Sequence, residues 1–253
     1  MKFRKVIIGV DPSTAADVAV EAGRRLVEPA GTIALVGVGE IAVVGGLGTM
    51  ATSVVTPYPG AARERVDRFA SSLEGLETRT VAVEGAPTTV LLDAAADAGA
   101  DLIVVGSHDT GRMAGIVLGS TATAAVHDAS CSVLVARGTI ADGWPRKVVV
   151  GIDGSAESLA ALSAARAIAE RAGADVVPLL GIEGISLGDL AIARESVDGL
   201  EESLAPPVKA LVEAAEHADL VVVGSRGLKG LKALGSVSER VAHKAPCSVL
   251  VVR

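Results

Sequence analysis

The chain has 253 residues, of which half are apolar and only 2% aromatic, and its net charge at pH 7 is −7. This length suits one large domain or two small ones, and small branched side chains suit buried parallel strands beneath alanine-rich helices. The acidic balance argues against a nucleic-acid-binding protein, which needs clustered basic residues.

The N-terminal part of the chain contains two apolar runs that do not look like membrane segments. The run within MKFRKVIIGVD is too short for a signal peptide and ends in Asp11. The stretch 33–55 is long enough for a bilayer span, but its glycines and Glu40 make it a poor membrane helix. We therefore expect a cytoplasmic protein in which residues 40–59 form a long glycine-rich loop, the least ordered part of the first half.

Strands and helices alternate through the first half of the sequence. Strands are predicted at 4–10, 33–39, 78–83, 101–106 and 131–136, and helices at 13–26, 60–74, 88–98 and 119–128. This alternation predicts an α/β fold with a parallel sheet and right-handed crossovers.

Three blocks of sequence occur twice, in the same order. The pairs are KVIIGVDPST (5–14) with KVVVGIDGSA (147–156), DLIVVGS (101–107) with DLVVVGS (219–225), and GSTATAAVHDASCSVLVAR (119–137) with GSVSERVAHKAPCSVLVVR (235–253). Two copies of one unit explain this pattern best. We expect domains at 1–137 and 147–253, joined by a linker at 138–146 that is rich in turn-forming residues.

The second copy is shorter in its middle. Strands are predicted at 147–152, 176–182, 190–197, 219–224 and 247–252, and helices at 156–172, 206–217 and 235–244. No counterpart of the first-copy helix at 60–74 is apparent in this pattern. The second domain is therefore expected to be trimmed by about one helix.

Polar and glycine residues follow the first and fourth strands of both copies. In an open parallel sheet these strand ends meet at one crevice, where a carboxylate can bind a ribose or base edge. Glycine turns and helix N-termini there can hold phosphate. The alternative for each aspartate is a helix N-cap, because serine and a helix follow at once. The candidate residues are Asp11, Gly106, Gly119 and Ser120 in the first copy, and Asp153, Gly224, Ser225, Gly235 and Ser236 in the second.

Weaker signals complete the set of candidates. Gly37-Val38-Gly39 follows a strand and fits the start of a dinucleotide fingerprint, with a chance match as the alternative, and Val38 is kept as a candidate. Ser107, His108 and Asp109 are consecutive and cannot form a catalytic relay. We expect no catalytic residue and no metal beyond nucleotide-bound magnesium.

The order VxxGxDxS, DLxVVGS, a loop ending in Gly-Ser and a final CSVLVxR strand resembles the universal stress protein family in its tandem two-domain form. The resemblance implies a doubly wound sheet in each half with strand order 3-2-1-4-5, and often ATP or AMP in the crevice. The family's signature is Gly-x2-Gly-x9-Gly followed by Ser or Thr. The first copy has Asp109 at the second glycine, and the second copy has Gly227 there but only seven residues before Gly235.

The resemblance implies a stress-response regulator, and with the strand-end residues it predicts binding of ATP or AMP with little or no turnover. A nucleotide-free interaction protein of the same fold is the alternative, and a slow ATPase ranks last because no general base or metal cluster is evident. We expect tighter binding in the second copy, where Arg226, Lys229 and Lys232 attract an anion that Asp109 repels in the first.

The two final strands, 131–136 and 247–252, are apolar throughout, and such an edge invites association. We expect two separate sheets, related by a pseudo-twofold axis, whose final strands meet antiparallel as an intramolecular pseudo-dimer. The resemblance implies the same arrangement, and a homodimer of the whole chain is a further option. No disulfide should link Cys131 and Cys247.

Overall fold

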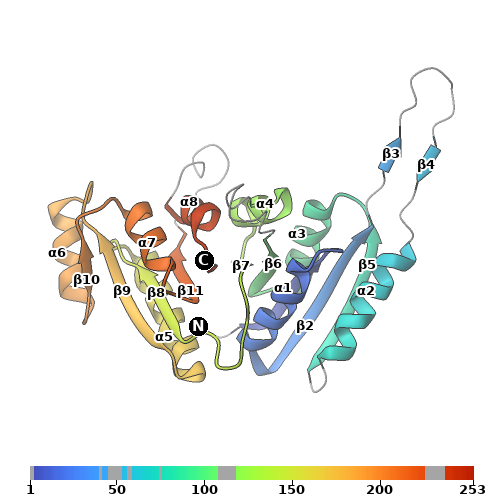
Figure 1. The fold of residues 1–253 in the computed structure, drawn as a ribbon, viewed down its shortest axis with the longest axis horizontal. Helices are drawn as coiled ribbons and strands as arrows, with labels where there is room; N and C mark the ends of the chain where they lie inside the picture. The colour runs from blue at the N-terminus through green and yellow to red at the C-terminus, as the bar shows by residue number, and fades with distance from the viewer. Residues whose placement is uncertain are drawn as a thin grey trace.

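The structure is a computed structural model that describes residues 3–39, 42–44, 53–55, 59–73, 76–107, 118–225 and 237–253. Two α/β halves lean apart from a shared centre, and each presents its helices on both sides of a sheet (Figure 1). We refer to the part from β1 to β7 as the first half and to the part from β8 to β12 as the second half.

The elements of both halves follow the alternation that the sequence predicts. The first half contains β1 (Phe3–Val10), α1 (Ala15–Leu26), β2 (Val27–Gly39), β3 (Ala42–Val44), β4 (Ser53–Val55), α2 (Pro59–Ser72), β5 (Glu77–Glu84), α3 (Pro87–Ala98), β6 (Leu102–Gly106), α4 (Ser120–Asp128) and β7 (Ser132–Ala136). The second half contains β8 (Lys147–Gly151), α5 (Ala156–Ala172), β9 (Asp175–Gly181), α6 (Leu187–Ser196), β10 (Glu201–Ser203), α7 (Pro207–Ala215), β11 (Leu220–Gly224), α8 (Val237–Lys244) and β12 (Ser248–Val252).

The main sheet has ten strands in the order β10-β9-β8-β11-β12-β7-β6-β1-β2-β5. Within each half the strands are parallel, and their order is 3-2-1-4-5, which confirms the predicted doubly wound fold. Helices α1, α2, α5 and α6 pack on one face of the sheet, and α3, α4, α7 and α8 pack on the other. One apolar cluster on each face runs through both halves, so the core is continuous across the centre.

The centre of the sheet is the antiparallel pair β7–β12, as predicted. Leu134 lies opposite Leu250, and both side chains are fully buried. This pairing corrects the expectation of two separate sheets, because it joins the halves into one sheet without an exposed edge at the centre. Cys131 and Cys247 are both free thiols, in agreement with the prediction that no disulfide links them.

The repeated CSVLVxR sequence has a structural explanation at this centre, which sequence reasoning missed. The backbone N–H of Arg137 donates to Ser248 Oγ at 3.0 Å, and the backbone N–H of Arg253 donates to Ser132 Oγ at 3.2 Å. The guanidinium of Arg137 donates to the carbonyl of Ala245 at 2.9 Å, and that of Arg253 donates to a carbonyl of the first half. The serine and arginine of each copy therefore bind the other copy.

Removing the hydroxyl of Ser248 is expected to destabilise the protein. Ser248 is fully buried, and its Oγ both accepts from the Arg137 N–H and donates to the Arg137 carbonyl at 3.1 Å. Ser248→Ala should lower the free energy of unfolding by about 1–3 kcal/mol, because buried backbone groups lose their partner. Urea denaturation measures this loss, and Ser132→Ala, which removes a single described bond, should cost less. Equal, negligible losses in both variants would contradict this role of the hydroxyl.

The middle of the second half differs from the prediction. The strand expected at 190–197 is the helix α6, and the third strand is the short β10 at 201–203. The helix begins because Ser186 caps it, its Oγ accepting from the N–H of Asp189 at 3.1 Å. The second half is therefore not trimmed by a helix. It is shorter in a connection instead. The β9–α6 connection spans only residues 182–186, whereas in the first half β2 and α2 are joined by residues 40–58, which include the short strands β3 and β4.

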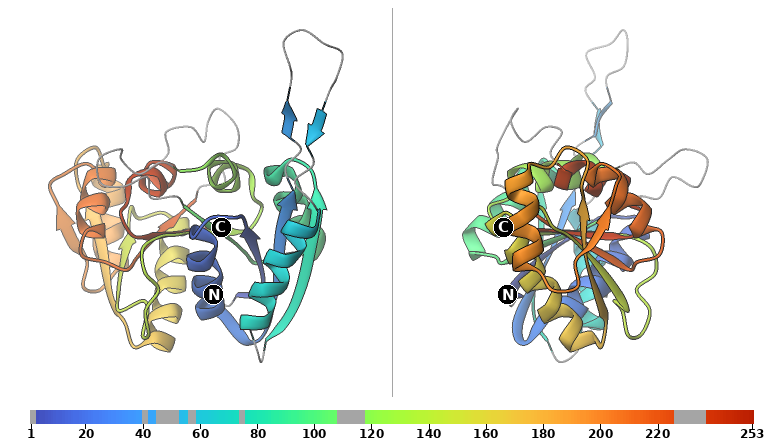
Figure 2. Two further views of the ribbon diagram at one scale, coloured as in Figure 1. Left: turned by 45° about the vertical axis from the view of Figure 1, so that its right-hand side comes forward. Right: turned by 90° about the vertical axis from the view of Figure 1, so that its left-hand side faces the viewer.

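The expected glycine-rich loop at 40–59 lies largely outside the described residues, so its predicted mobility stays a prediction. The short strands β3 and β4 within it pair antiparallel, with Ala42 opposite Val55, and project beyond the end of β2 (Figure 2). None of the helices in the described ranges combines the length and the hydropathy that a bilayer span requires.

Candidate functional site

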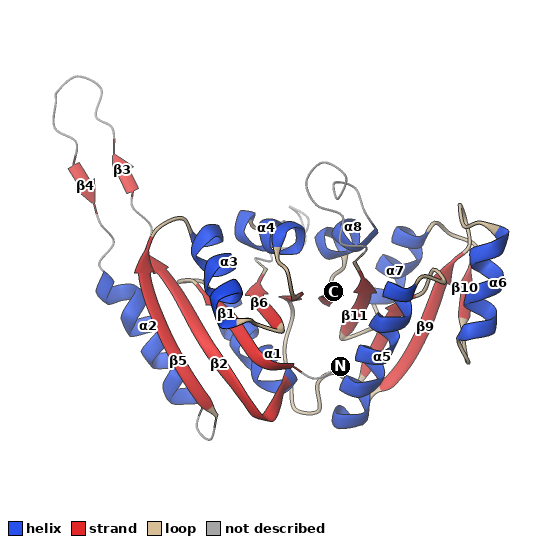
Figure 3. Ribbon diagram, turned by 180° about the vertical axis from the view of Figure 1, so that it is seen from behind, coloured by secondary structure: helices blue, strands red, loops and turns tan. Residues whose placement is uncertain are grey.

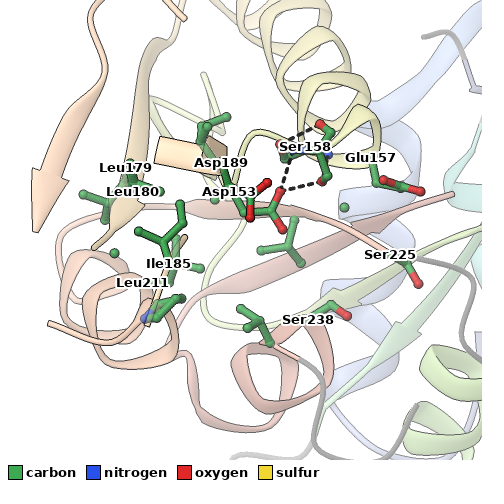
Figure 4. A pocket seen from close by; sticks show the side chains of 18 of the residues that line it. Asp153, Glu157, Ser158, Leu179, Leu180, Ile185, Asp189, Leu211, Ser225 and Ser238 are labelled. Carbon is green, nitrogen blue, oxygen red and sulfur yellow. Dashed lines mark hydrogen bonds between the residues drawn. The ribbon is translucent and has the colours of Figure 1, made fainter. Parts of the chain in front are cut away.

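A cavity of about 520 Å³ opens in the second half, beyond the carboxyl ends of β8, β9 and β11 (Figure 4). This is the edge at which doubly wound sheets bind ligands. The predicted residues Asp153, Gly224 and Ser225 all line it. The structure thus brings together the three described candidates of the second copy. The other three, Gly227, Gly235 and Ser236, lie outside the described residues, as do Asp109, Arg226, Lys229 and Lys232.

Asp153 lies in the turn between β8 and α5. Its Oδ1 accepts hydrogen bonds from the backbone N–H of Ser155 at 3.0 Å and from the Ser155 hydroxyl. Ser155 is the N-cap of α5, and its Oγ accepts from the N–H of Ser158 at 3.2 Å. The cap is therefore Ser155, and Asp153 holds that cap in place while its carboxylate lines the cavity.

Another part of the cavity wall is apolar. Leu179 and Leu180 at the end of β9, Ile185 in the β9–α6 connection and Leu211 of α7 line it (Figure 4). Such a wall can take a flat, largely apolar group such as a purine base. The carboxylate of Asp153 then lies where a polar sugar would follow.

Gly224 ends β11 in a position that admits no side chain. A Cβ atom built there would lie 2.5 Å from the backbone C and O atoms of Glu157, in the first turn of α5. Glycine at this strand end therefore lets the start of α5 approach the sheet closely. Ser225 follows, held by a hydrogen bond from its N–H to the carbonyl of Val252 at 2.9 Å.

The first turn of α8 forms a further part of the wall. Val237, Ser238 and Glu239 all line the cavity. Backbone N–H groups at a helix N-terminus favour a negatively charged ligand. The cavity thus has an apolar part near β9 and an end suited to an anion near Ser225 and α8.

Residues of the first half also reach this cavity. Val126 and His127, near the end of α4, line it, and Nε2 of His127 lies 2.8 Å from Oε1 of Glu239. Both side chains are nearly buried, each 12% exposed. Close by, burial lowers the pKa of His243. The negative charge of Glu239 opposes this shift, and the positive charge of Arg137 adds to it.

Among the described residues that line the cavity, the ionisable side chains are all acidic apart from His127, and neither lysine nor arginine occurs. The acidic ones are Asp153, Glu157, Glu183, Asp189 and Glu239. The described part of the chain contains no group of three or more residues suited to hold a metal ion.

Several lining residues were missed because the start of α6 was mistaken for the approach to a strand. Glu183, Ser186 and Asp189 line the cavity from the β9–α6 connection and the first turn of α6. Gly154 has a positive φ of 80°, and a Cβ there would lie 2.7 Å from the Asp189 carbonyl, so α6 packs closely on the Asp153 turn. The Ser186–Asp189 cap was the signal that identifies this helix.

The first-half candidates occupy the matching positions of their sheet. Oδ1 of Asp11 accepts from the N–H of Ser13 at 3.0 Å, as Asp153 does from Ser155, but Asp11 is exposed. Gly106 ends β6, and a Cβ there would lie 2.4 Å from the Ala15 carbonyl oxygen. Gly119 and the exposed Ser120 begin α4, and Val38 lies near the end of β2 opposite Val83. All five residues lie along one edge of the sheet.

Comparison with known proteins gives consistent results for sequence and structure. The model of the universal stress protein family matches residues 2–137 and 191–253. A universal stress protein of Mycolicibacterium smegmatis is 35% identical over 209 residues, which cover 71% of this chain and 70% of that protein. One of Mycobacterium bovis is 33% identical over 183 residues, covering 61% of this chain and 62% of its own length.

Among solved structures, a universal stress protein from Archaeoglobus fulgidus superposes with a TM-score of 0.73. The superposition covers 100% of this chain and 99% of the Archaeoglobus chain, and the two sequences are 19% identical. A likeness at this identity shows a shared fold alone. The present chain spans 70% and 62% of the two mycobacterial relatives.

Proposed function

Because the chain belongs to the universal stress protein family, we propose that it is a cytoplasmic stress-response regulator that binds ATP or AMP in the cavity of its second half. We further propose that residues 1–137 and 147–253 are two domains joined by 138–146. Only the second would keep a tight site.

The observation that carries this proposal is the cavity itself. It joins an apolar wall for a base, the Asp153 carboxylate for a ribose, and the glycine turn and α8 N-terminus for phosphate. Its volume of about 520 Å³ lies within the range of small-molecule sites. Gly227, Gly235 and Ser236, together with Gly106, Gly119, Ser120, Asp11 and Val38 in a weaker first site, complete the proposed binding residues.

A second candidate function is a nucleotide-free interaction protein. The acidic side chains around the cavity favour it, because carboxylates such as Glu157 and Glu239 repel phosphate. The two functions differ in one simple observable, which is whether an adenine nucleotide accompanies the freshly purified protein.

Replacing Asp153 tests the nucleotide site. Asp153→Ala should weaken AMP and ATP binding at least about tenfold, because a ribose loses a charge-assisted hydrogen bond. Asp11→Ala is the matched control. It removes the equivalent carboxylate of the first half, which binds Ser13 as Asp153 binds Ser155, and it should leave nucleotide affinity in the second half unchanged. Chromatography of the denatured protein identifies bound nucleotide, and calorimetric titration gives the affinities.

Two results would count against this proposal. If wild-type protein binds neither AMP nor ATP and none co-purifies, the interaction protein replaces the nucleotide regulator. If Asp11→Ala abolishes binding and Asp153→Ala does not, the site lies in the first half.

A further inference from the structure

The cavity of the second half is completed by the first half. Helices α4 and α8 lie beside each other where the halves meet (Figure 3), and Val126 and His127 of α4 line the cavity. The imidazole of His127 contacts Glu239 of α8 across this boundary, with Nε2 and Oε1 2.8 Å apart. Because each side chain is only 12% exposed, solvent screens this contact little.

Glu239 lies at the end of the cavity that suits an anion. It belongs to the first turn of α8, which lines the cavity with Val237 and Ser238. The helix N-terminus there attracts a phosphate, but the carboxylate of Glu239 repels one. An imidazole can offset a carboxylate by donating a neutral N–H or, when protonated, by carrying a positive charge.

We propose that His127 of the first half is a specificity-determining residue of the second half's ligand site, where it offsets the charge of Glu239 and so admits a phosphate group. The inference rests on the proposed function, since it matters only for an anionic ligand. It adds that the first half is part of the site, and that the pair His127–Glu239 sets how tightly a nucleotide binds relative to its nucleoside.

The pseudo-symmetric position lacks this pair. The repeated block aligns His127 with His243 and Glu239 with Thr123, which carries no charge. Burial also lowers the pKa of His243 and favours its neutral form. Charged groups near the described pair include Arg137, which acts on His243, and Arg253, whose guanidinium donates to the His127 carbonyl at 3.4 Å and feels the charge of Asp128. At this aligned position the second half therefore has a carboxylate that an imidazole can offset, and the first half has an uncharged threonine.

Calorimetric titration of AMP and of adenosine at pH 7 tests this role. His127→Leu should weaken AMP binding about 3- to 10-fold and leave adenosine binding unchanged, since adenosine carries no phosphate. Glu239→Gln should strengthen AMP binding, and His127→Leu should add no loss in the Glu239→Gln background, because the two residues act as a pair. His217→Leu is the control, an exposed histidine outside the cavity.

The inference is overturned if His127→Leu weakens AMP and adenosine equally, which is the result of a purely structural role, or if it changes neither. It is also overturned if the loss persists in the Glu239→Gln background. Should His127→Leu not fold, His127→Gln is measured in its place, and the same outcomes decide. Failure of the proposed function is distinct, because wild-type protein would then bind neither ligand.

Discussion

Leu250→Asp is expected to prevent folding of the native protein. Leu250 is fully buried in β12, opposite Leu134 in the antiparallel pair that joins the halves. A carboxylate at this fully buried position would be shielded from solvent and has no described partner of opposite charge in the ladder, and burial of such a group costs more than about 4 kcal/mol. Since domains of this kind have a stability of about 5–15 kcal/mol, most of the protein should be unfolded or aggregated.

Circular dichroism and urea denaturation measure this effect. Leu204→Asp is the matched control, because the Leu204 side chain is 86% exposed just after β10. It should change the free energy of unfolding by no more than about 0.5 kcal/mol. Native-like unfolding of Leu250→Asp would show that the β7–β12 pair is not the core of the molecule.

Gly224→Ala is expected to impair both stability and ligand binding. The new Cβ would lie 2.5 Å from backbone atoms of Glu157, so α5 must move away from β11. Overpacking of this kind costs about 1–3 kcal/mol. Because Glu157 and Ser158 line the cavity, the same movement should change its shape and weaken AMP binding at least about tenfold.

Two further alanine variants separate these effects. Gly106→Ala makes the equivalent clash with Ala15 in the first half and should lower stability without changing binding in the second. Gly119→Ala meets no described atom within 4 Å and has an ordinary φ of −62°, so it should cost less stability than the other two variants and leave binding in the second half unchanged. Urea denaturation and AMP titration of all three variants measure both. Wild-type stability of Gly224→Ala would contradict the steric argument.

The repeated blocks predicted where the strands lie, because each strand is a short apolar run with a clear turn at its end. The strand order 3-2-1-4-5 was predicted only through the family resemblance. The repeated blocks also predicted the β7–β12 pair, since CSVLVAR and CSVLVVR are apolar throughout and would otherwise form an exposed edge. The helix α6 was missed because its apolar residues, Leu190 and Ile192 among them, alternate as in a strand. Its cap at Ser186, a local contact, was the better signal.

The candidate site was predicted in part. The strand-end rule identified Asp153, Gly224 and Ser225, which do line one cavity. The same rule cannot identify residues that reach the cavity from another unit. His127 and Glu239 are 112 positions apart, and their contact depends on how the halves pair, which periodicity and spacing along the chain do not encode.

The connection between β7 and β8 has a consequence for dilute solution. Trp144 in this connection is buried in the core, and Asp142 accepts a hydrogen bond from the Arg25 guanidinium at 2.7 Å. A short tether keeps its two ends at an effective concentration on the order of millimolar, so the paired halves should not dissociate at low protein concentration as two separate chains would. Each half is also encoded separately, so a single substitution alters one crevice and spares the other. A symmetric dimer of identical chains cannot diversify its two sites in this way.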